Sequence, residues 1–269
     1  MKTWLLRISV ALCVLACLAT GGGWVWREYY SAEQFRAGML AGEYEKAERL
    51  KRWGADTEPW RKADSAQQLQ AAITADDARQ VHFLIRLGAP VDADIVFSRS
   101  ILKGAEVPGK PLHWAAELGH SDLVKLFLAH GAEVDDKDNL YGWTPLHEAV
   151  IMGFIDVAEL LLVRGANVDA KDDDGRTPLD WSAVYRHTDI AKLLLAYGAE
   201  VDAKDNDGRM PLHFAALQAF IDIAKLLLAH GADPNSKDRK GESPLDIWPE
   251  LAEIVKEVEA EKAKDGTKP

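Results

Sequence analysis

The stretch that decides the fold is Thr144-Pro145-Leu146-His147-Glu148-Ala149, because its Pro-Leu pair recurs along the chain. The recurring prolines are spaced by 33 residues, after a first step of 34, and stand at Pro111, Pro145, Pro178, Pro211 and Pro244. Each Pro-Leu pair is followed by His or Asp. A fixed period of this size is typical of one supersecondary unit stacked on copies of itself. The sequence therefore predicts a solenoid.

A second landmark, Gly-Ala, falls 19 residues after each motif leucine, at Gly131, Gly165, Gly198 and Gly231. Physical chemistry explains both landmarks. Thr144 can cap a helix that starts at Pro145, where the missing amide proton costs nothing. Gly165 can adopt the left-handed conformation that ends a second helix. The polar stretch 169–176 then predicts a hairpin-like loop, called a finger below, that leads to the next unit.

The motif stretch Thr144–Ala149 resembles the signature of the ankyrin repeat. Residues 210–215 (Met-Pro-Leu-His-Phe-Ala) differ from that signature at one position, where Met210 replaces threonine. The resemblance is explicit over residues 110–248 and weaker over 31–92. It implies an all-α solenoid of helix-turn-helix units joined by fingers. One such unit cannot bury its apolar face alone, whereas a row of units builds a continuous core.

The landmarks predict about seven units, of which the first, second and last are degenerate caps. These units begin near residues 35, 69, 112, 146, 179, 212 and 245. We expect one repeat domain over residues 31–258, with a last helix at about 250–259. It is preceded by an apolar helix within residues 1–30 and followed by a polar tail, 259–269.

The register is broken in a few places. The finger near 93–110 carries about ten extra residues, and Ile95-Val96-Phe97 is too apolar for a solvated loop. This insertion is either a flap packed on its own repeats or a loop that contacts a partner. The finger 139–143 has one extra residue, and Arg186 and Ala219 replace the glycine expected between two helices.

The N-terminal run from Ile8 to Trp26 has 19 residues without a charge, enough to cross a bilayer as a helix. Aromatic residues at both ends and Lys2 and Arg7 before the run favour a retained span with the repeats on the non-cytoplasmic side. In a bacterium this would place the repeat domain in the periplasm. The alternatives are a cleaved signal peptide, cut near Ala19, and a lipid anchor at Cys17.

Charge and composition exclude some functions. The chain has a net charge of −11, and its first 30 residues, with three basic and one acidic side chain, carry +2, which leaves −13 elsewhere. An acidic body argues against nucleic acid as a partner, because that ligand needs a basic footprint. Both cysteines, Cys13 and Cys17, lie in the apolar run, so thiol catalysis in the repeats is excluded. We expect a monomer.

No pattern predicts catalysis, a cofactor or a metal. The motif histidines His113, His147 and His213 lie one per repeat, where the resemblance implies that each braces a finger turn. The Asp-rich finger tips at 172–175 and 205–208 look like fragments of a calcium loop. However, the bidentate glutamate of such a loop is replaced by Trp181 or Phe214.

The resemblance implies a binding surface on the concave side, made of finger tips and the exposed ends of the first helices. Tyr, Trp, Met and Arg are enriched there and are typical of interface hot spots. The predicted partner-binding residues are Leu118, Leu140, Tyr141, Trp143, Ile151, Met152, Arg176, Tyr185, Arg209 and Gln218. Trp114, Trp181 and Phe214 are predicted to form mainly core or groove floor.

The predicted function is therefore a non-catalytic scaffold, exported and membrane-tethered, that binds a protein partner of unknown identity. The alternative is an inhibitor or immunity protein of the same fold that blocks an exported enzyme.

Overall fold

The computed structural model describes residues 65–264, apart from 87–88, 90, 93–94 and 100–104. The chain divides into two compact units, one ending at Pro90 and the other beginning at Val91. In the first, α4 (Ser65–Thr74) packs against α5 (Ala78–Arg86). This helix pair coincides with the repeat predicted near residue 69. The repeat predicted near residue 35 lies outside the described residues.

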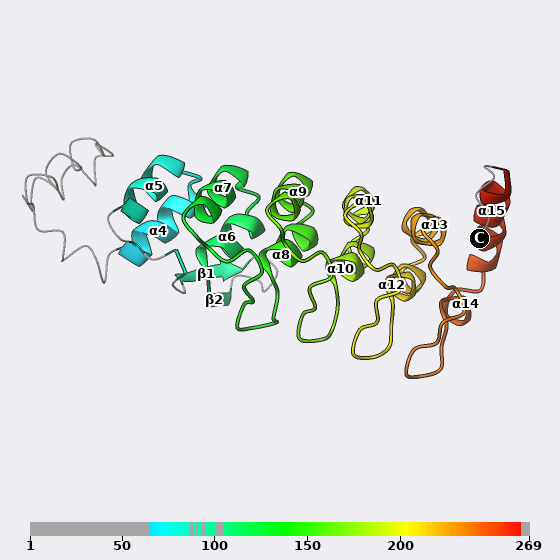
Figure 1. Cartoon of the computed structure of the whole chain (residues 1–269). Helices are drawn as coiled ribbons and strands as arrows, with labels where there is room; N and C mark the ends of the chain where they lie inside the picture. The colour runs from blue at the N-terminus through cyan, green and yellow to red at the C-terminus, as the bar shows by residue number, and fades with distance from the viewer. Residues whose placement is uncertain (1–64, 87–88, 90, 93–94, 100–104, 265–269) are drawn as a thin grey trace, which may run out of the picture. The chain divides into compact units, whose positions relative to one another are not determined.

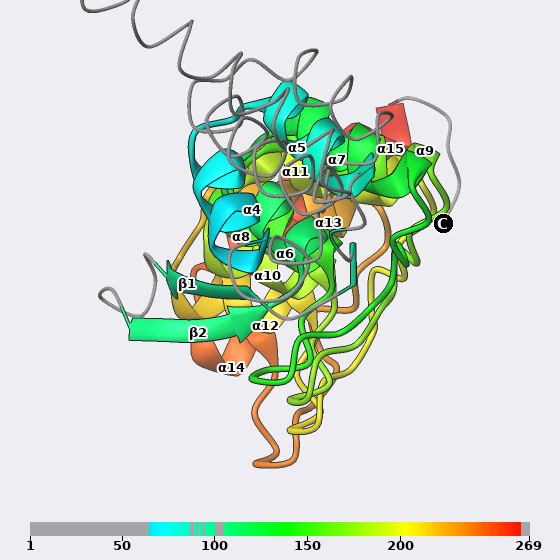
Figure 2. The same ribbon diagram turned by 90° about the vertical axis from the view of Figure 1, so that its left-hand side faces the viewer.

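The described part of the second unit contains helix pairs that repeat along the chain (Figure 1). Their bounds are α6 (Pro111–Glu117) and α7 (Ser121–Ala129), α8 (Pro145–Met152) and α9 (Ile155–Val163), α10 (Pro178–Val184) and α11 (Thr188–Ala196), α12 (Pro211–Leu217) and α13 (Ile221–Ala229), and α14 (Pro244–Ile247) and α15 (Leu251–Lys264). Within this unit, each first helix packs on the next first helix and each second helix on the next second helix. The fingers between pairs project on the side of the first helices, and Figure 2 shows them following one another along the row.

Each first helix begins where the Pro-Leu motif predicts. The hydroxyl of Thr144 accepts a hydrogen bond from the His147 amide at 3.4 Å, and His147 Nδ1 accepts one from the Thr144 amide at 3.1 Å. This reciprocal capping box satisfies amides that the first helical turn leaves free. Thr177 and Asp180 form the same box in α10. The predicted cap and the proline at the first helical position are confirmed.

The turns between helices use left-handed backbone. The second helices α7, α9, α11 and α13 end at glycines with φ between 88° and 97°, as predicted for Gly165. Between first and second helices, the left-handed position is held by Gly153 at φ 82° in one unit. Arg186 at φ 59° and Ala219 at φ 52° hold it in the next two. These two side chains therefore occupy a conformation that only glycine adopts without strain.

The core runs between the two rows of helices. The motif leucines Leu146 and Leu179 are fully buried, as are Leu161 and Leu194 on the second helices. Ala149 is also fully buried, and its small side chain allows neighbouring first helices to approach closely. Since each unit packs on its neighbours, the core is continuous along this part of the chain.

Two segments depart from the prediction. The insertion forms an antiparallel hairpin, β1 (Ile95–Arg99) and β2 (Ala105–Gly109), so the fold is not all-α at this place. Its Ile-Val-Phe run has high strand propensity, and β2 supplies the strand with which it pairs. Helix α15 continues to Lys264, into the predicted polar tail, because alanine, glutamate and lysine favour helix. Lys262 Nζ also donates to the Leu228 carbonyl at 2.8 Å.

The predicted membrane segment, residues 8–26, and the predicted N-terminal helix lie outside the described residues. Among the described helices, none combines the length and the apolar character that crossing a bilayer requires.

Candidate functional site on the first helices and fingers

The four fingers that follow α7, α9, α11 and α13 are each closed by a buried aspartate. Asp138 Oδ1 accepts hydrogen bonds from the amides of Leu140, Tyr141 and Trp143 at 2.9–3.3 Å. Asp172, Asp205 and Asp238 bind the amides of their own fingers in the same way. These carboxylates therefore hold the turns. In the described ranges, no group of three or more potential ligands could hold a metal ion.

Neighbouring fingers are tied at their tips by backbone hydrogen bonds. The amide of one finger donates to the carbonyl that precedes the glycine of the finger before it: Asp173 to Tyr141 at 3.0 Å, Asn206 to Asp174 at 2.9 Å, and Arg239 to Asp207 at 2.8 Å. The extra residue of the 139–143 finger does not disturb this tie, because it is accommodated before Gly142. The tips thus keep one register along the stack.

Side chains add two further ties at the bases of the fingers. Carboxylates accept from amides of the next unit, namely Asp135 from Asn167 at 2.9 Å, Asp169 from Glu200 at 2.9 Å, and Asp202 from Asp233 at 3.2 Å. Lysines donate to carbonyls of the next unit, Lys137 to Lys171 at 2.6 Å and Lys171 to Lys204 at 2.9 Å. The fingers are therefore a connected edge rather than a set of independent loops.

The motif histidines connect each first helix to the following finger. His147 Nε2 lies 3.3 Å from the Arg176 carbonyl, and its Nδ1 accepts from the Thr144 amide. Nε2 therefore carries the proton and donates it. Burial lowers the pKa of His147 to about 4, although the bond to Arg176 opposes the shift. Burial also lowers the pKa of His213. The predicted bracing role of the motif histidines is confirmed.

Asp180 takes the place of the histidine in α10. Its Oδ2 accepts from the Thr177 amide at 2.7 Å and from the Thr177 hydroxyl at 2.9 Å. Burial raises the pKa of Asp180 to about 7, although both hydrogen bonds from Thr177 oppose the shift, and the nearby Asp205 and Asp172 raise it further. The Pro-Leu-Asp motif in the sequence did not reveal this titration.

Aromatic rings form a row across two units. Tyr141 packs on Trp143 with ring centroids 4.6 Å apart, Trp143 meets the edge of Trp181 at 5.5 Å, and Trp181 stacks on Tyr185 at 5.9 Å. We call these four residues the aromatic row. Trp181 Nε1 donates to Asp172 Oδ2 at 2.9 Å, which fixes the central ring to its finger.

Arg176 lies over this row. Its guanidinium carbon is 5.0 Å from the centroid of the Trp181 ring and 5.6 Å from that of Phe214. Cations are attracted to ring faces at such distances. The arginine therefore links the aromatic row to α12 in the next unit.

The structure brings together part of the predicted partner-binding set. Arg176 and Tyr185 contact the Trp181 ring directly, and Tyr141 is linked to it through Trp143. Among the predicted residues, Leu118, Leu140, Tyr185 and Gln218 are exposed, and Tyr141, Met152, Arg176 and Arg209 are half-buried. Arg209 Nε lies 3.7 Å from Asp238 Oδ2, so this arginine also faces the next finger.

Two predicted contacts need correction. Trp143 is only 6% exposed and Ile151 only 4%. Trp143 is covered because Tyr141 and Trp181 pack on it, and Ile151 because its short first helix is buried around most of its circumference. Both side chains support the surface from below rather than form it.

Sequence reasoning missed two exposed apolar side chains at the turns between helices, Ile155 and Ile221. A signal was available. Ile155 and Ile221 open the second helices α9 and α13, where α7 and α11 begin with Ser121 and Thr188. A large apolar residue at a position that is polar in sister units marks an exposed apolar surface.

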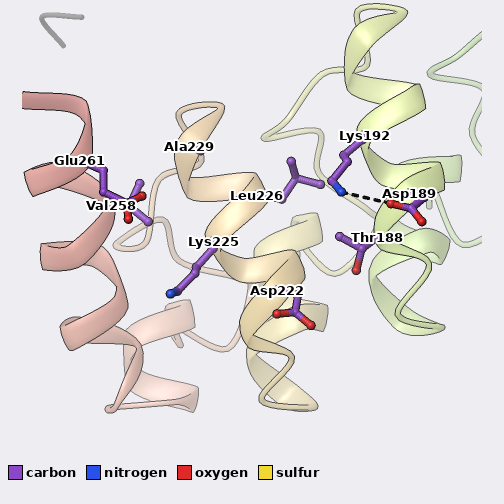
Figure 3. A pocket seen from close by; sticks show the side chains of 9 residues that line it. All are labelled: Thr188, Asp189, Lys192, Asp222, Lys225, Leu226, Ala229, Val258 and Glu261. Atoms are coloured by element: carbon purple, nitrogen blue, oxygen red, sulfur yellow. Dashed lines mark hydrogen bonds and ion pairs between the residues drawn. The ribbon is translucent and has the colours of Figure 1, made fainter. Parts of the chain in front are cut away.

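A shallow hollow of about 550 Å³ lies on the row of second helices, between α11, α13 and α15 (Figure 3). Its lining is charged, and Lys192 pairs with Asp189 at 3.1 Å while Lys225 pairs with Glu257 at 2.8 Å. The hollow is thus a groove between neighbouring second helices.

Comparison with protein families found one matching family model, described as Ankyrin repeats (3 copies), over residues 69–172 and 161–238. The matched ranges cover more than half of the chain and run from within α4 to beyond the end of α13. A comparison with curated proteins found no match. The resemblance seen in the Pro-Leu motif is thereby confirmed.

Proposed function

The chain belongs to the ankyrin repeat family, and from this membership we propose that it is a non-catalytic scaffold that binds a protein partner. Repeats of this family are protein–protein interaction modules. We propose that the partner docks on the finger face, which consists of the first helices α6, α8, α10 and α12 and the fingers that follow them in the row.

The aromatic row is the observation that carries this proposal. Tyr185 is 42% exposed although its ring stacks on Trp181, so a large amphipathic side chain is presented to solvent in a fixed orientation. Leu140 at a finger tip and Leu118 at the end of α6 add exposed apolar surface. Fixed aromatic anchors with apolar neighbours are typical of interface hot spots.

The ties between fingers support the same proposal. A partner that touches several fingers meets loops already held in register by backbone and side-chain hydrogen bonds. Since binding is opposed by the ordering of mobile groups, such prior ordering lowers the entropic cost of association.

The partner can be tested by crosslinking in intact cells with the native N-terminus, followed by identification of the captured protein. A double variant of the finger face, Tyr185→Ala with Leu140→Ser, should abolish capture. The matched control is Tyr197→Ala with Val163→Ser, because Tyr197 is 41% exposed but ends the second helix α11. Equal capture by both double variants would refute the finger face as the binding surface.

We further propose that the scaffold is exported and held in the membrane by residues 8–26. The support is the uncharged 19-residue run with aromatic residues at both ends. Alkaline extraction of membranes should leave the chain in the pellet, and the mass of the purified protein should equal that of the full chain. A mass lower than that of the full chain would indicate a cleaved signal peptide. A chain that begins at Cys17 and is heavier than its sequence predicts would indicate lipidation.

A further inference from the structure

Three junctions between a first helix and the next finger are made in the same way. An imidazole Nε2 lies close to a finger carbonyl: His113 at 3.1 Å from Trp143, His147 at 3.3 Å from Arg176, and His213 at 3.2 Å from Glu242. Each of these carbonyls also accepts a hydrogen bond from the aspartate amide that closes its own finger. The imidazole is therefore a brace between one unit and the next.

The junction after α10 is built differently. The equivalent carbonyl is that of Arg209, which closes its finger by accepting from the Asp205 amide at 2.8 Å. The residue facing it from α10 is Asp180, whose carboxyl is shorter than an imidazole. Oδ2 is bound to Thr177, and Oδ1 is buried without a hydrogen-bond partner. The brace present at the other three junctions is missing here.

The surroundings of Asp180 are acidic. Asp172 and Asp205, from the fingers on either side, are both buried. The nearby arginines are engaged elsewhere, Arg176 with the rings of Trp181 and Phe214, and Arg209 with Asp238.

Near neutral pH, α8 and α12, which pack on α10, add no positive charge, and Lys192 of α11, which also packs on α10, is exposed and paired with Asp189. Burial lowers the pKa of His147 on α8 and of His213 on α12, so both imidazoles are neutral there. The buried Glu148 on α8 is a further acidic group. In the described residues, no cation forms an ion pair with Asp180. Its environment thus favours the neutral carboxyl.

We propose that the junction between α10 and the finger Asp205–Arg209 is a proton-controlled joint, closed while Asp180 is neutral and loosened when its carboxyl ionises. A neutral carboxyl can remain buried in this position, as the neutral imidazoles do in the other units. Ionisation places a third negative charge beside Asp172 and Asp205 away from water, which is costly unless the junction opens. The proton is released to solvent.

Such a joint would regulate the finger face. Tyr185 directly follows α10, whereas Arg209 lies on the next finger, so opening moves these two predicted contacts apart. This consequence rests on the proposed function, but the joint itself rests on the fold alone and can be tested without a partner.

Hydrogen exchange of the full-length chain, corrected for intrinsic rates, tests the joint directly. With the pKa of Asp180 near 7 in the closed form and near 3.8 in the open form, the population of the open form should rise about tenfold between pH 6 and pH 8. Amides of α10 and of residues 205–210 should show this loss of protection. Amides of α8 and of residues 172–176 should not.

Two variants and a control complete the test. Asp180→Asn removes the titrating group and Asp180→His restores the imidazole, so both should abolish the pH-dependent loss of protection. Asp246→Asn is the control, because Asp246 holds the same motif position in α14 but is exposed. A pH-dependent loss that persists in Asp180→Asn would overturn the proposal. If that variant does not fold, carbon-13 NMR of the wild-type Asp180 carboxyl decides, and titration below pH 5 would refute it.

Discussion

The unit that begins at Pro145 and the unit that begins at Pro178 have nearly the same backbone but different chemistry. In both, a threonine caps the first helix and the third helical residue returns the bond. His147 is neutral because it has lost a proton, whereas Asp180 is neutral because it keeps one. The comparison teaches that the position of a hydrogen-bonding atom sets the shape of a unit, while its chemical type sets the response to pH.

The largest expected effect is the loss of stability when the buried motif leucine, which the two units share, is shortened. Leu146 and Leu179 are both fully buried, so Leu146→Ala and Leu179→Ala should each lower the free energy of unfolding by about 3 kcal/mol. Urea denaturation of the full-length chain measures both. Costs that differ by more than ~2 kcal/mol would show that the cores of the two units are not equivalent.

The second effect is the pH dependence of stability, which should differ between the two units. The folded chain protonates His147 only near pH 4, whereas the unfolded chain does so near 6.5. Between these values the unfolded state binds more protons, so the contribution of His147 to stability should fall by about 3 kcal/mol as pH drops from 6.5 to 4. For Asp180 the folded state holds the extra proton, so its contribution to stability should fall as pH rises from about 4 to about 7.

Urea midpoints measured from pH 4 to pH 8 test both contributions, which oppose each other between pH 4 and pH 6.5. His147→Asn should therefore make the fall in stability from pH 4 to pH 7 steeper, because the opposing contribution of the imidazole has been removed. A pH profile identical to that of the wild type would show that His147 does not contribute to it.

A third effect concerns the turn after each first helix. Gly153→Ala should cost about 2 kcal/mol, because φ is 82° and an added Cβ would lie 2.8 Å from His187 Cε1. Arg186 already has a left-handed φ, and its ion pair with Asp222 at 3.0 Å is exposed. Arg186→Gly should therefore change stability by less than about 0.5 kcal/mol. Thermal unfolding checks both, and equal losses would contradict the strain argument.

The smallest effect tests the caps. Thr144→Val removes a hydroxyl that bonds His147, at a cost of about 1 kcal/mol. Thr177→Val should cost the same at pH 6 but more at pH 8, since the ionised form of Asp180 loses a donor. Denaturation of both variants at the two pH values measures the difference. A Thr177→Val cost that is flat with pH would argue that Asp180 does not ionise in this range.

Much of the fold could be predicted from the sequence because the repeat depends on local rules. The motif proline starts each first helix from α6 to α14, glycine closes the second helices from α7 to α13, and the motif histidine reaches the next finger. The hairpin at 95–109 was missed because strand pairing depends on a partner segment, which an apolar run does not identify. The extension of α15 beyond the predicted end was missed because no glycine marks the end of this helix in the sequence.

The finger face could be predicted only in part. Spacing locates the end of a first helix but not which of its last residues points outward, so Ile151 was placed on the surface with Met152. Trp143 was misplaced for a similar reason, since the rings of Tyr141 and Trp181 cover it. The raised pKa of Asp180 depends on burial and on Asp172 and Asp205, which come together only in the folded chain.

The ties between fingers have a consequence for the growth of such a chain. In each tie the donor and the acceptor occupy fixed positions of successive units, as in the bonds from Asp173 to Tyr141 and from Asn206 to Asp174. One finger thus carries two complementary sides, one that receives its predecessor and one that receives its successor. A duplicated unit would bring both sides with it, so the fingers put no limit on the number of units that gene duplication can add.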